Sequence, residues 1–318
     1  MSTPVVTVIV PGRDVAPYAE EALESLRTQT LPAWRAILID DGSRDATGSL
    51  FHRAAATDPR FRVVTHDRPR GLGAARNAGL DLVETPFVAF LDADDILTPR
   101  ALERLVGTLD ATGSDFVVGA YVRLRPTDEG YAPGPVQPWV AAATDPERRG
   151  VTLSDHPAAS GNIVAWSKAS RVEFWRRNRL RFPDDRLYED QLVAQQMYTR
   201  ARAFDVIPDV VVQWRERADG SSITQHRAQL PVLIDYIEGL RGGLAVLDAA
   251  DARAAAQARV DLVLDLDVPP LVRIAQTHPD PDYRRRVGAL VRDFIARAPG
   301  HRSGAGDAAE LLRAARLW

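Results

Sequence analysis

Short apolar runs alternate with helical patterns along the first 120 positions of this 318-residue chain. The runs are rich in Val, Ile, Leu and Phe, which is typical of buried strands, and they occupy residues 5–10, 35–39, 61–64, 87–91 and 116–120. The segments between them carry apolar residues at helical spacing, over residues 18–29, 45–56, 72–83 and 99–109. This alternation predicts an α/β fold in which helices flank a mostly parallel central sheet.

The pattern changes after residue 120. Residues 126–160 are rich in Pro, Gly and Ala, and we expect a loop there. A further helix is predicted to begin near Glu189. From residue 228 to the end, Ala, Leu, Arg and Asp recur at helical spacing, with predicted breaks at Gly242-Gly243 and Pro269-Pro270. The chain therefore divides into an α/β domain over 1–227 and a helical subdomain over 228–318.

Composition excludes several classes of protein. The formal net charge of -3 argues against a general nucleic-acid binder. The sequence has no cysteine, which excludes disulfides, thiolate nucleophiles and cysteine-based zinc sites. No run approaches the roughly 20 apolar residues that span a bilayer. We expect a soluble, cytoplasmic protein, with attachment to the inner face of the cell membrane left open.

The most informative feature is the acidic cluster Asp92, Asp94 and Asp95, which follows the apolar run at 87–91. In open α/β sheets, residues at the carboxyl ends of strands face the ligand crevice. Neighbouring carboxylates repel one another unless a cation lies among them. Mg²⁺ and Mn²⁺ prefer carboxylate oxygens and commonly share substrate phosphates. The alternatives are a solvated acidic loop or a helix cap, a role that suits Asp95.

Asp40 and Asp41 end a second apolar run in the same way. A carboxylate there can accept a hydrogen bond from a pyrimidine imide or a ribose hydroxyl. The alternative is a simple turn at Asp41-Gly42.

Three further segments carry chemistry. The glycines of 70–79 would let backbone N–H groups approach an anion, and Arg76 would neutralise a diphosphate, although a lone surface arginine is the alternative. Glu189 and Asp190 stand at a predicted helix start, where they serve either as helix caps or as a general base. His226 follows a Gly-Ser-Ser loop and either completes a metal shell or is a structural histidine.

Six motifs, in this order, resemble family 2 glycosyltransferases with the GT-A fold over residues 4 to about 226. They are VTVIVPGRDVAPYAEEALESLRTQTLPAW, ILIDDGSRDAT, RGLGAARNAG, FVAFLDADDILTP, YEDQL and WRERADGSSIT. The later part is also similar to bacterial enzymes that glycosylate cell-surface polymers such as teichoic acids. Residues 228–318 match no family that we can name.

The resemblance implies a nucleotide-binding half over 1–120 and an acceptor half over 121–227. The donor is expected to be a nucleotide sugar, with UDP favoured. Pro11 would lie against the base, Asp41 would bind the base with support from Asp40, and Arg76 would lie near the base and diphosphate. Asp92 would contact ribose or metal-bound water.

The resemblance also implies the reaction. Asp94, with His226, would hold Mn²⁺ or Mg²⁺ at the diphosphate. Asp190 would be the general base and Glu189 would contact substrate. A single displacement would then invert configuration at the sugar. The acceptor would be a glycan, a polymer or a lipid-linked molecule.

Two departures from the family pattern affect this picture. Gly12-Arg13-Asp14 replaces the usual aromatic and asparagine, which alters the nucleotide pocket. The QxxRW motif and membrane helices of processive synthases are absent from the sequence, so we expect transfer of one sugar at a time.

The competing functions are a nucleotidyltransferase acting on a sugar phosphate and a non-catalytic nucleotide-sugar-binding protein. The helical tail would pack on the catalytic domain, form a homo-oligomer or lie on an anionic membrane.

Overall fold

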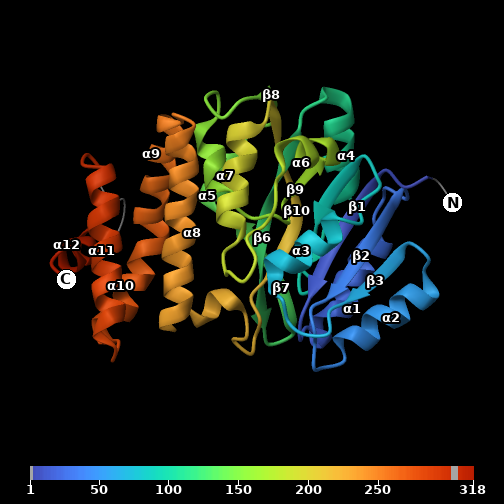
Figure 1. The fold of residues 1–318 in the computed structure, drawn as a ribbon, viewed down its shortest axis with the longest axis horizontal. Coiled ribbons are helices and arrows are strands. Elements are labelled where there is room, and N and C mark those ends of the chain that lie inside the picture. The colour runs from blue at the N-terminus through green and yellow to red at the C-terminus, as the bar shows by residue number, and fades with distance from the viewer. Residues whose placement is uncertain (1–2, 302–306) are drawn as a thin grey trace.

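A ten-stranded sheet forms the centre of the protein, described here by a computed structural model of residues 3–301 and 307–318 (Figure 1). Eight strands follow one path in the order β3-β2-β1-β4-β9-β6-β10-β5, while β7 pairs with β6 and β8 with β10. The strands are β1 (Val6–Gly12), β2 (Trp34–Asp40), β3 (Phe61–Thr65), β4 (Phe87–Phe90), β5 (Ile96–Leu97), β6 (Phe116–Thr127), β7 (Gly130–Val136), β8 (Arg148–Val151), β9 (Lys168–Arg171) and β10 (Phe204–Arg215).

The amino-terminal half of the sheet is parallel. β1 pairs with β2 and β4, and β2 pairs with β3, all in parallel register. Every residue of β1 is buried, as expected for a strand that is covered on both faces. The carboxyl ends of β1, β2 and β4 therefore meet at one edge, which places the two predicted acidic segments together.

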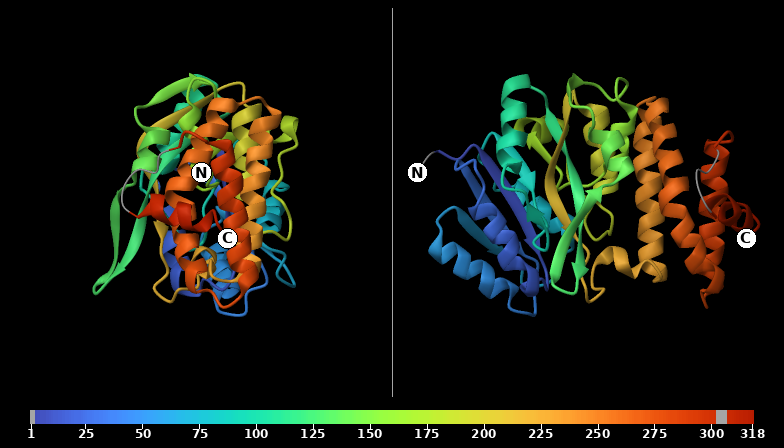
Figure 2. Two further views of the ribbon diagram at one scale, coloured as in Figure 1. Left: turned by 90° about the vertical axis from the view of Figure 1, so that its left-hand side faces the viewer. Right: turned by 180° about the vertical axis from the view of Figure 1, so that it is seen from behind.

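The second half of the sheet is mixed. β9 runs antiparallel between β4 and β6, whereas β6 and β10 are parallel to each other. β6 continues into β7 as a two-stranded ribbon that projects from the body of the protein (Figure 2). The parallel arrangement inferred from the early alternation thus holds for β1 to β4, and antiparallel pairing is added beyond them.

The prediction of a loop over 126–160 was wrong. This region contains β7, α5 (Pro138–Thr144), β8 and a short 3₁₀ turn, η1 (Pro157–Gly161). β7 carries prolines at 133 and 135 and is largely exposed, so no apolar pattern reveals it. It forms because backbone groups pair with β6 at the edge of the sheet, where proline is tolerated.

Helices of the α/β part alternate with the strands as predicted. They are α1 (Ala16–Arg27), α2 (Thr47–Thr57), α3 (Leu72–Leu80), α4 (Ala101–Thr112), α6 (Val172–Asn178) and α7 (Asp190–Arg200). The cap proposed for Asp95 is wrong, because α4 begins only at Ala101. Asp95 is buried and its Oδ1 instead accepts a hydrogen bond from the backbone N–H of Arg215 at 2.8 Å.

The C-terminal segment stacks beside the sheet domain (Figure 1). Its helices are α8 (Leu230–Ala249), α9 (Arg253–Leu262), a π-helical turn η3 (Val263–Asp267), α10 (Val268–Thr277), α11 (Pro281–Arg297) and α12 (Ala308–Ala315). Its buried apolar residues join those of the α/β part in one core cluster. The packing role considered for the tail is therefore present in this structure.

The predicted helix break at Gly242-Gly243 was wrong, because α8 runs through both residues. A Cβ at Gly243 would lie 3.3 Å from the carbonyl oxygen of Gln191 in α7. The glycine therefore allows a close approach of two helices rather than ending one. Pro269-Pro270 likewise does not end a helix, since it occupies the first turn of α10, where proline is tolerated.

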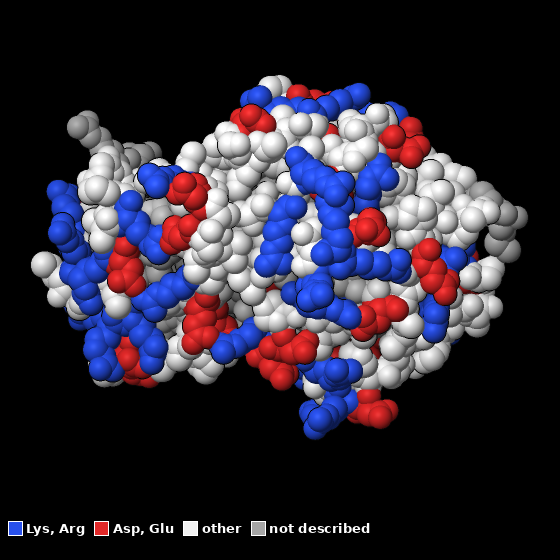
Figure 3. All heavy atoms as spheres, turned by 45° about the horizontal axis from the view of Figure 1, so that its top comes forward, with Lys and Arg blue, Asp and Glu red and all other residues white. Residues whose placement is uncertain are grey.

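Charged side chains of both signs cover the face drawn in Figure 3, with Lys and Arg gathered near its centre. This mixture agrees with the nearly balanced totals of 40 basic and 43 acidic residues. Within residues 3–301 and 307–318, no helix combines the length and apolar composition needed to cross a bilayer.

Candidate active site

The end of β1 holds in place the two acidic segments, which are Asp40-Asp41 and residues 92–95. The carbonyl oxygen of Pro11 accepts a hydrogen bond from the N–H of Ala93 at 3.2 Å, and that of Gly12 accepts one from the N–H of Asp41 at 3.0 Å. Pro11 is buried in β1 opposite Ile39 of β2. The two predicted acidic segments therefore share a backbone anchor at the carboxyl edge of the sheet.

Asp41 is enclosed by the segment that precedes α3. Its Oδ1 accepts from the backbone N–H of Arg70 at 2.9 Å and lies 2.7 Å from Nδ1 of His66, while Oδ2 accepts from Gly71 N–H at 2.9 Å. Gly71 has φ +88°, a conformation that favours glycine. Within the described chain, the anion that these two N–H groups meet is the Asp41 carboxylate. Because each carboxylate oxygen has about two acceptor sites, Oδ2 can still accept one further hydrogen bond.

Asp40 lies at the end of β2 and is buried. Its Oδ1 accepts from the backbone N–H of Ser43 at 3.0 Å. A Cβ at Gly48, in α2, would lie 2.5 Å from Oδ2 of Asp40, so a side chain there would displace the Asp40 carboxylate. Asp40 thus fixes the backbone bend at 41–43, and its support of Asp41 in binding the base stays a prediction.

Arg76 joins two of the predicted site segments. Its Nη2 donates to Oδ1 of Asp92 at 2.7 Å, and its Nη1 pairs with Oε1 of Glu189. Arg76 is only 1% exposed, so a surface arginine, the alternative considered from sequence, is not what the fold contains. Burial alone would lower the pKa of Arg76, but Asp92 and Glu189 outweigh it and raise the pKa above its usual value. The guanidinium is a permanent cation between carboxylates from distant parts of the chain.

Asp94 is paired with a cation from the end of β10. Its Oδ2 accepts from Nε of Arg217 at 2.8 Å, and its backbone carbonyl accepts from Nε of Arg215 at 2.7 Å. Burial raises the pKa of Asp94, Arg217 opposes that change, and nearby Asp92 adds to it. The mutual repulsion expected of this acidic cluster is therefore countered by arginine side chains.

The carboxylates of Asp92 and Asp94 suit a hard divalent cation, because their side chains keep 21% and 16% of their surface exposed at the sheet edge. Within the described residues, no group of three or more His, Asp and Glu side chains is placed to hold a metal. A metal bound here would therefore take further oxygens from elsewhere, as Mg²⁺ does when it shares substrate phosphates. His226 is exposed at the end of the turn η2 (Ile223–His226), and its part in metal binding stays a prediction.

Glu189 and Asp190 stand at the start of α7 and differ in surroundings. Glu189 is 4% exposed, and burial raises its pKa to about 7 although Arg76 opposes this. Asp190 is partly exposed, and burial again raises its pKa, against the influence of Arg76. Within residues 3–301 and 307–318 no side chain hydrogen-bonds to the Asp190 carboxylate, whose nearby donor is the backbone N–H of Gln191, so the carboxylate can still accept a proton.

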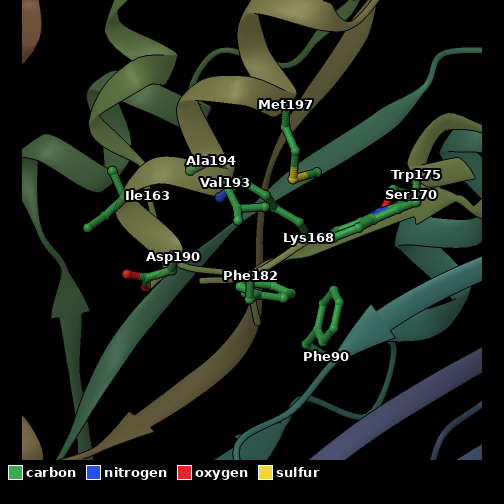
Figure 4. A pocket seen from close by; sticks show the side chains of 11 residues that line it. Phe90, Ile163, Lys168, Ser170, Trp175, Phe182, Asp190, Val193, Ala194 and Met197 are labelled. Carbon is green, nitrogen blue, oxygen red and sulfur yellow. The ribbon is translucent and has the colours of Figure 1, made fainter. Parts of the chain in front are cut away.

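A small cavity of about 10 Å³ lies beside Asp190 (Figure 4). It has room for about one water molecule. Lys168 lines it, and its ammonium donates to the carbonyl oxygens of Asn162 at 2.8 Å and Val164 at 2.7 Å. Burial lowers the pKa of Lys168 to about 7. Lys168 therefore fixes the loop that faces Asp190 across this cavity.

Sequence reasoning missed His66, Lys168 and the partners of the arginines in β10. Arg217 lies inside the WRERADGSSIT motif, but its pairing with Asp94 was not predicted. The contact between His66 and Asp41 joins residues 25 apart in sequence, and no local pattern encodes it. Lys168 is the only lysine of the sequence, a composition signal that could have singled it out, although no local pattern shows that it is buried.

Comparison with known proteins gives a consistent result. The family model of glycosyl transferase family 2 matches residues 7–195. EpsH of Bacillus subtilis (strain 168) is 28% identical over 227 residues, which are 68% of this chain and 62% of EpsH. The succinoglycan biosynthesis protein ExoO of Rhizobium meliloti (strain 1021) is 38% identical over 115 residues, covering 36% of this chain and 32% of ExoO. The chain thus spans less than two thirds of the length of these relatives.

Among solved structures, residues 1–349 of S. aureus TarS align with a TM-score of 0.71 at 19% identity, over 98% of this chain and 87% of that one. The complex of TarS with UDP-GlcNAc aligns with a TM-score of 0.66 at 20% identity, over 98% and 88%. At such identities the likeness concerns the fold, and it confirms the predicted α/β class with the GT-A arrangement.

Proposed function

Because this chain belongs to glycosyl transferase family 2, we propose that it transfers one sugar at a time from a nucleotide sugar to a hydroxyl group, with inversion at the sugar carbon. The observation that carries the proposal is the bridge from Asp92 through Arg76 to Glu189. It links the edge assigned to the donor with the segment assigned to the acceptor. Reacting groups must be held in a fixed mutual geometry for a displacement to be fast, and this buried cation supplies such a link.

The donor half would use the strand ends. Asp41 retains one acceptor site on Oδ2, which suits an N–H of the base, and Asp40 fixes the turn beside it. Asp92 would accept from ribose or a bound water. UDP is the favoured nucleotide, since TarS, which shares the fold, has been solved with UDP and with UDP-GlcNAc.

Asp94 would hold the metal, with His226 as a further ligand, while Asp92 would contact ribose or a water bound to that metal. The chemistry that bound Mn²⁺ or Mg²⁺ supplies is neutralisation of the charge on the departing diphosphate. Arg217 already lies against Asp94 and would add a positive charge next to the same diphosphate.

Asp190 would accept the proton of the acceptor hydroxyl while the oxygen of that hydroxyl attacks the anomeric carbon. Glu189 is held by Arg76 and is less able to serve, whereas the Asp190 side chain is free and partly exposed. A carboxylate with a raised pKa is a stronger base than an ordinary aspartate, which favours this proton transfer.

A glycan or polymer of the cell surface, or a lipid-linked precursor, is the proposed acceptor. The name of ExoO refers to the biosynthesis of succinoglycan, and that protein is 38% identical to this chain over 115 residues. The same proposal includes a cytoplasmic location and peripheral contact with a membrane. It also includes pairing of two chains through the C-terminal helices.

The test is a screen of nucleotide sugars with Mn²⁺ by thermal shift, followed by an assay of donor hydrolysis and transfer with and without EDTA. We expect a UDP-sugar to raise the melting temperature, because it binds only the folded state. Metal-dependent release of UDP supports the proposal. Pyrophosphate release from a nucleoside triphosphate would instead indicate a nucleotidyltransferase, and binding without turnover would indicate a binding protein.

A further inference from the structure

The residue before the Glu189–Asp190 pair has an unusual backbone. Tyr188 has φ +58°, in the left-handed region that bulky side chains rarely adopt. Such a conformation persists only where the surroundings hold it in place, and it is often found beside functional groups. The direction in which the chain enters α7 therefore depends on what holds Tyr188.

Helix α8 of the C-terminal segment holds it. The rings of Tyr188 and Tyr236 meet edge to face, with centroids 4.8 Å apart. One turn further along α8, a Cβ at Gly239 would lie 3.3 Å from the carbonyl oxygen of Tyr188. The helix therefore contacts both the side chain and the backbone of the strained residue.

Two hydrogen bonds fix the chain on either side of the Glu189–Asp190 pair. The N–H of Leu187 donates to Oδ2 of Asp235 in α8 at 3.2 Å. Nη2 of Arg259, in α9, donates to Oε1 of Gln191 at 3.0 Å, and both of these side chains are buried. Residues 187–191 are thus tied to α8 and α9 before and after the carboxylate pair.

From this geometry we propose that Tyr236 and Arg259 are positioning residues for Asp190. Through these two contacts α8 and α9 position the Glu189–Asp190 segment and do more than extend the fold. This inference rests on the proposed function, because it assumes that Asp190 is the base. It assigns a role to a segment that lies beyond residues 7–195, the part matched by the family model.

The contact between Tyr188 and Tyr236 depends on the rings. Arg227 and Asp267 lie near the hydroxyl groups of Tyr188 and Tyr236, but within the described chain neither buried hydroxyl oxygen makes a hydrogen bond of good geometry. Tyr236→Phe keeps the ring and should therefore preserve the arrangement, whereas Tyr236→Leu keeps an apolar side chain in the core but loses the edge-to-face contact. Comparing the two Tyr236 variants therefore tests whether the ring contact with Tyr188 matters, or whether any apolar side chain at position 236 is sufficient.

The experiment uses the full chain and five proteins: the wild type, Tyr236→Leu, Tyr236→Phe, Arg259→Met and Arg253→Met. Arg253 also lies in α9 but its side chain is 88% exposed, so its variant is the matched control. Three quantities are measured: hydrogen exchange of a peptide covering 183–192, the Kd of UDP with Mn²⁺, and kcat and KM for transfer.

We expect faster exchange of 183–192 in Tyr236→Leu and Arg259→Met, with unchanged exchange of a peptide covering 90–97. Their kcat should fall about tenfold or more, because small misplacement of a reacting group is costly, while the Kd of UDP stays constant. Tyr236→Phe and Arg253→Met should match the wild type in all three quantities.

Unchanged kcat in Tyr236→Leu and Arg259→Met, with or without faster exchange, would overturn the positioning role. Loss of kcat together with weaker UDP binding and faster exchange at 90–97 would also overturn it, since the damage would then be general. A wild-type protein that binds UDP but transfers nothing would refute the proposed function itself, and this result needs no variant to be recognised.

Discussion

Nε of Arg217 donates to Oδ2 of Asp94 at 2.8 Å, so the carboxylate proposed to bind metal is paired with a side-chain cation. The two side chains are only 15% and 16% exposed. Nη1 of Arg217 also lies 3.2 Å from Oγ of Ser221, in the loop that follows β10. Metal binding at Asp94 would compete with this ion pair, which couples the loop to the metal.

Replacing Arg217 should make that coupling measurable. Arg217→Ala is expected to bind Mn²⁺ about threefold to tenfold more tightly without donor, since an ion pair of about 1 kcal/mol no longer competes. Transfer should nevertheless fall, because a positive charge near the diphosphate is lost. Calorimetric titration of Mn²⁺ tests this. Arg125→Ala, which removes an exposed arginine of the β6–β7 ribbon, is the control and should change neither quantity. Weaker Mn²⁺ binding by Arg217→Ala would argue against competition.

Replacing the proposed base separates binding from chemistry. Asp190→Asn keeps the size of the side chain but cannot accept the acceptor's proton. We expect kcat to fall by about 10²-fold to 10⁴-fold, with an unchanged Kd for UDP and Mn²⁺. Steady-state kinetics and calorimetry on the same preparation provide the measurement. Near-normal turnover would remove Asp190 from this role.

The acidic limb of the pH profile of kcat/KM should report the protonation of Asp190. Burial raises the pKa of its carboxyl above the ordinary value of 3.8, and only the unprotonated form can accept a proton. As the pH falls, kcat/KM should therefore drop at a higher pH than an ordinary aspartate would give. In Lys168→Met a neighbouring positive charge that lowers the pKa of Asp190 is gone, so this drop should move to higher pH. A drop that stays in place, or moves to lower pH, would contradict the assignment.

A feature of the fold or of the candidate site could be predicted from the sequence only where a local sequence pattern encoded that feature. The parallel half of the sheet was predictable because each buried strand is a short apolar run between helical segments. The acidic strand ends were predictable for the same reason, since Asp40 and Asp92 directly follow such runs. β7 was not predictable, because its pairing uses backbone groups and its side chains are largely exposed.

The partners of the site residues were beyond sequence reasoning. The contact of Arg76 with Glu189 joins positions 113 apart, and that of Arg217 with Asp94 joins positions 123 apart. Charge alone allows many pairings, and only the fold selects among them. The glycines of α8 show the same limit, because a glycine that ends a helix and one that admits a neighbouring helix look alike in sequence.

The buried pair of Arg76 and Glu189 should also be visible in stability. Arg76→Met leaves the Glu189 carboxylate buried without its cation, which is expected to cost about 3 kcal/mol in the free energy of unfolding. Arg76→Met combined with Glu189→Leu should recover part of that loss, because the buried Glu189 charge is gone while Asp92, the other partner of Arg76, keeps 21% of its side chain exposed to solvent. Urea denaturation of the wild type, both single variants and the double variant gives the coupling. Additive effects of the two substitutions would show that the pair is not energetically linked.

The central claim is that carboxylates at the ends of neighbouring strands bind a nucleotide diphosphate through a divalent cation. Calorimetric titration of UDP into the wild type and Asp94→Asn, each with Mn²⁺ and with EDTA, tests it most directly. We predict binding by the wild type that depends on Mn²⁺, and at least about a tenfold loss of affinity in Asp94→Asn. Equal UDP affinity in the two proteins, or binding by the wild type that is indifferent to EDTA, would contradict the claim.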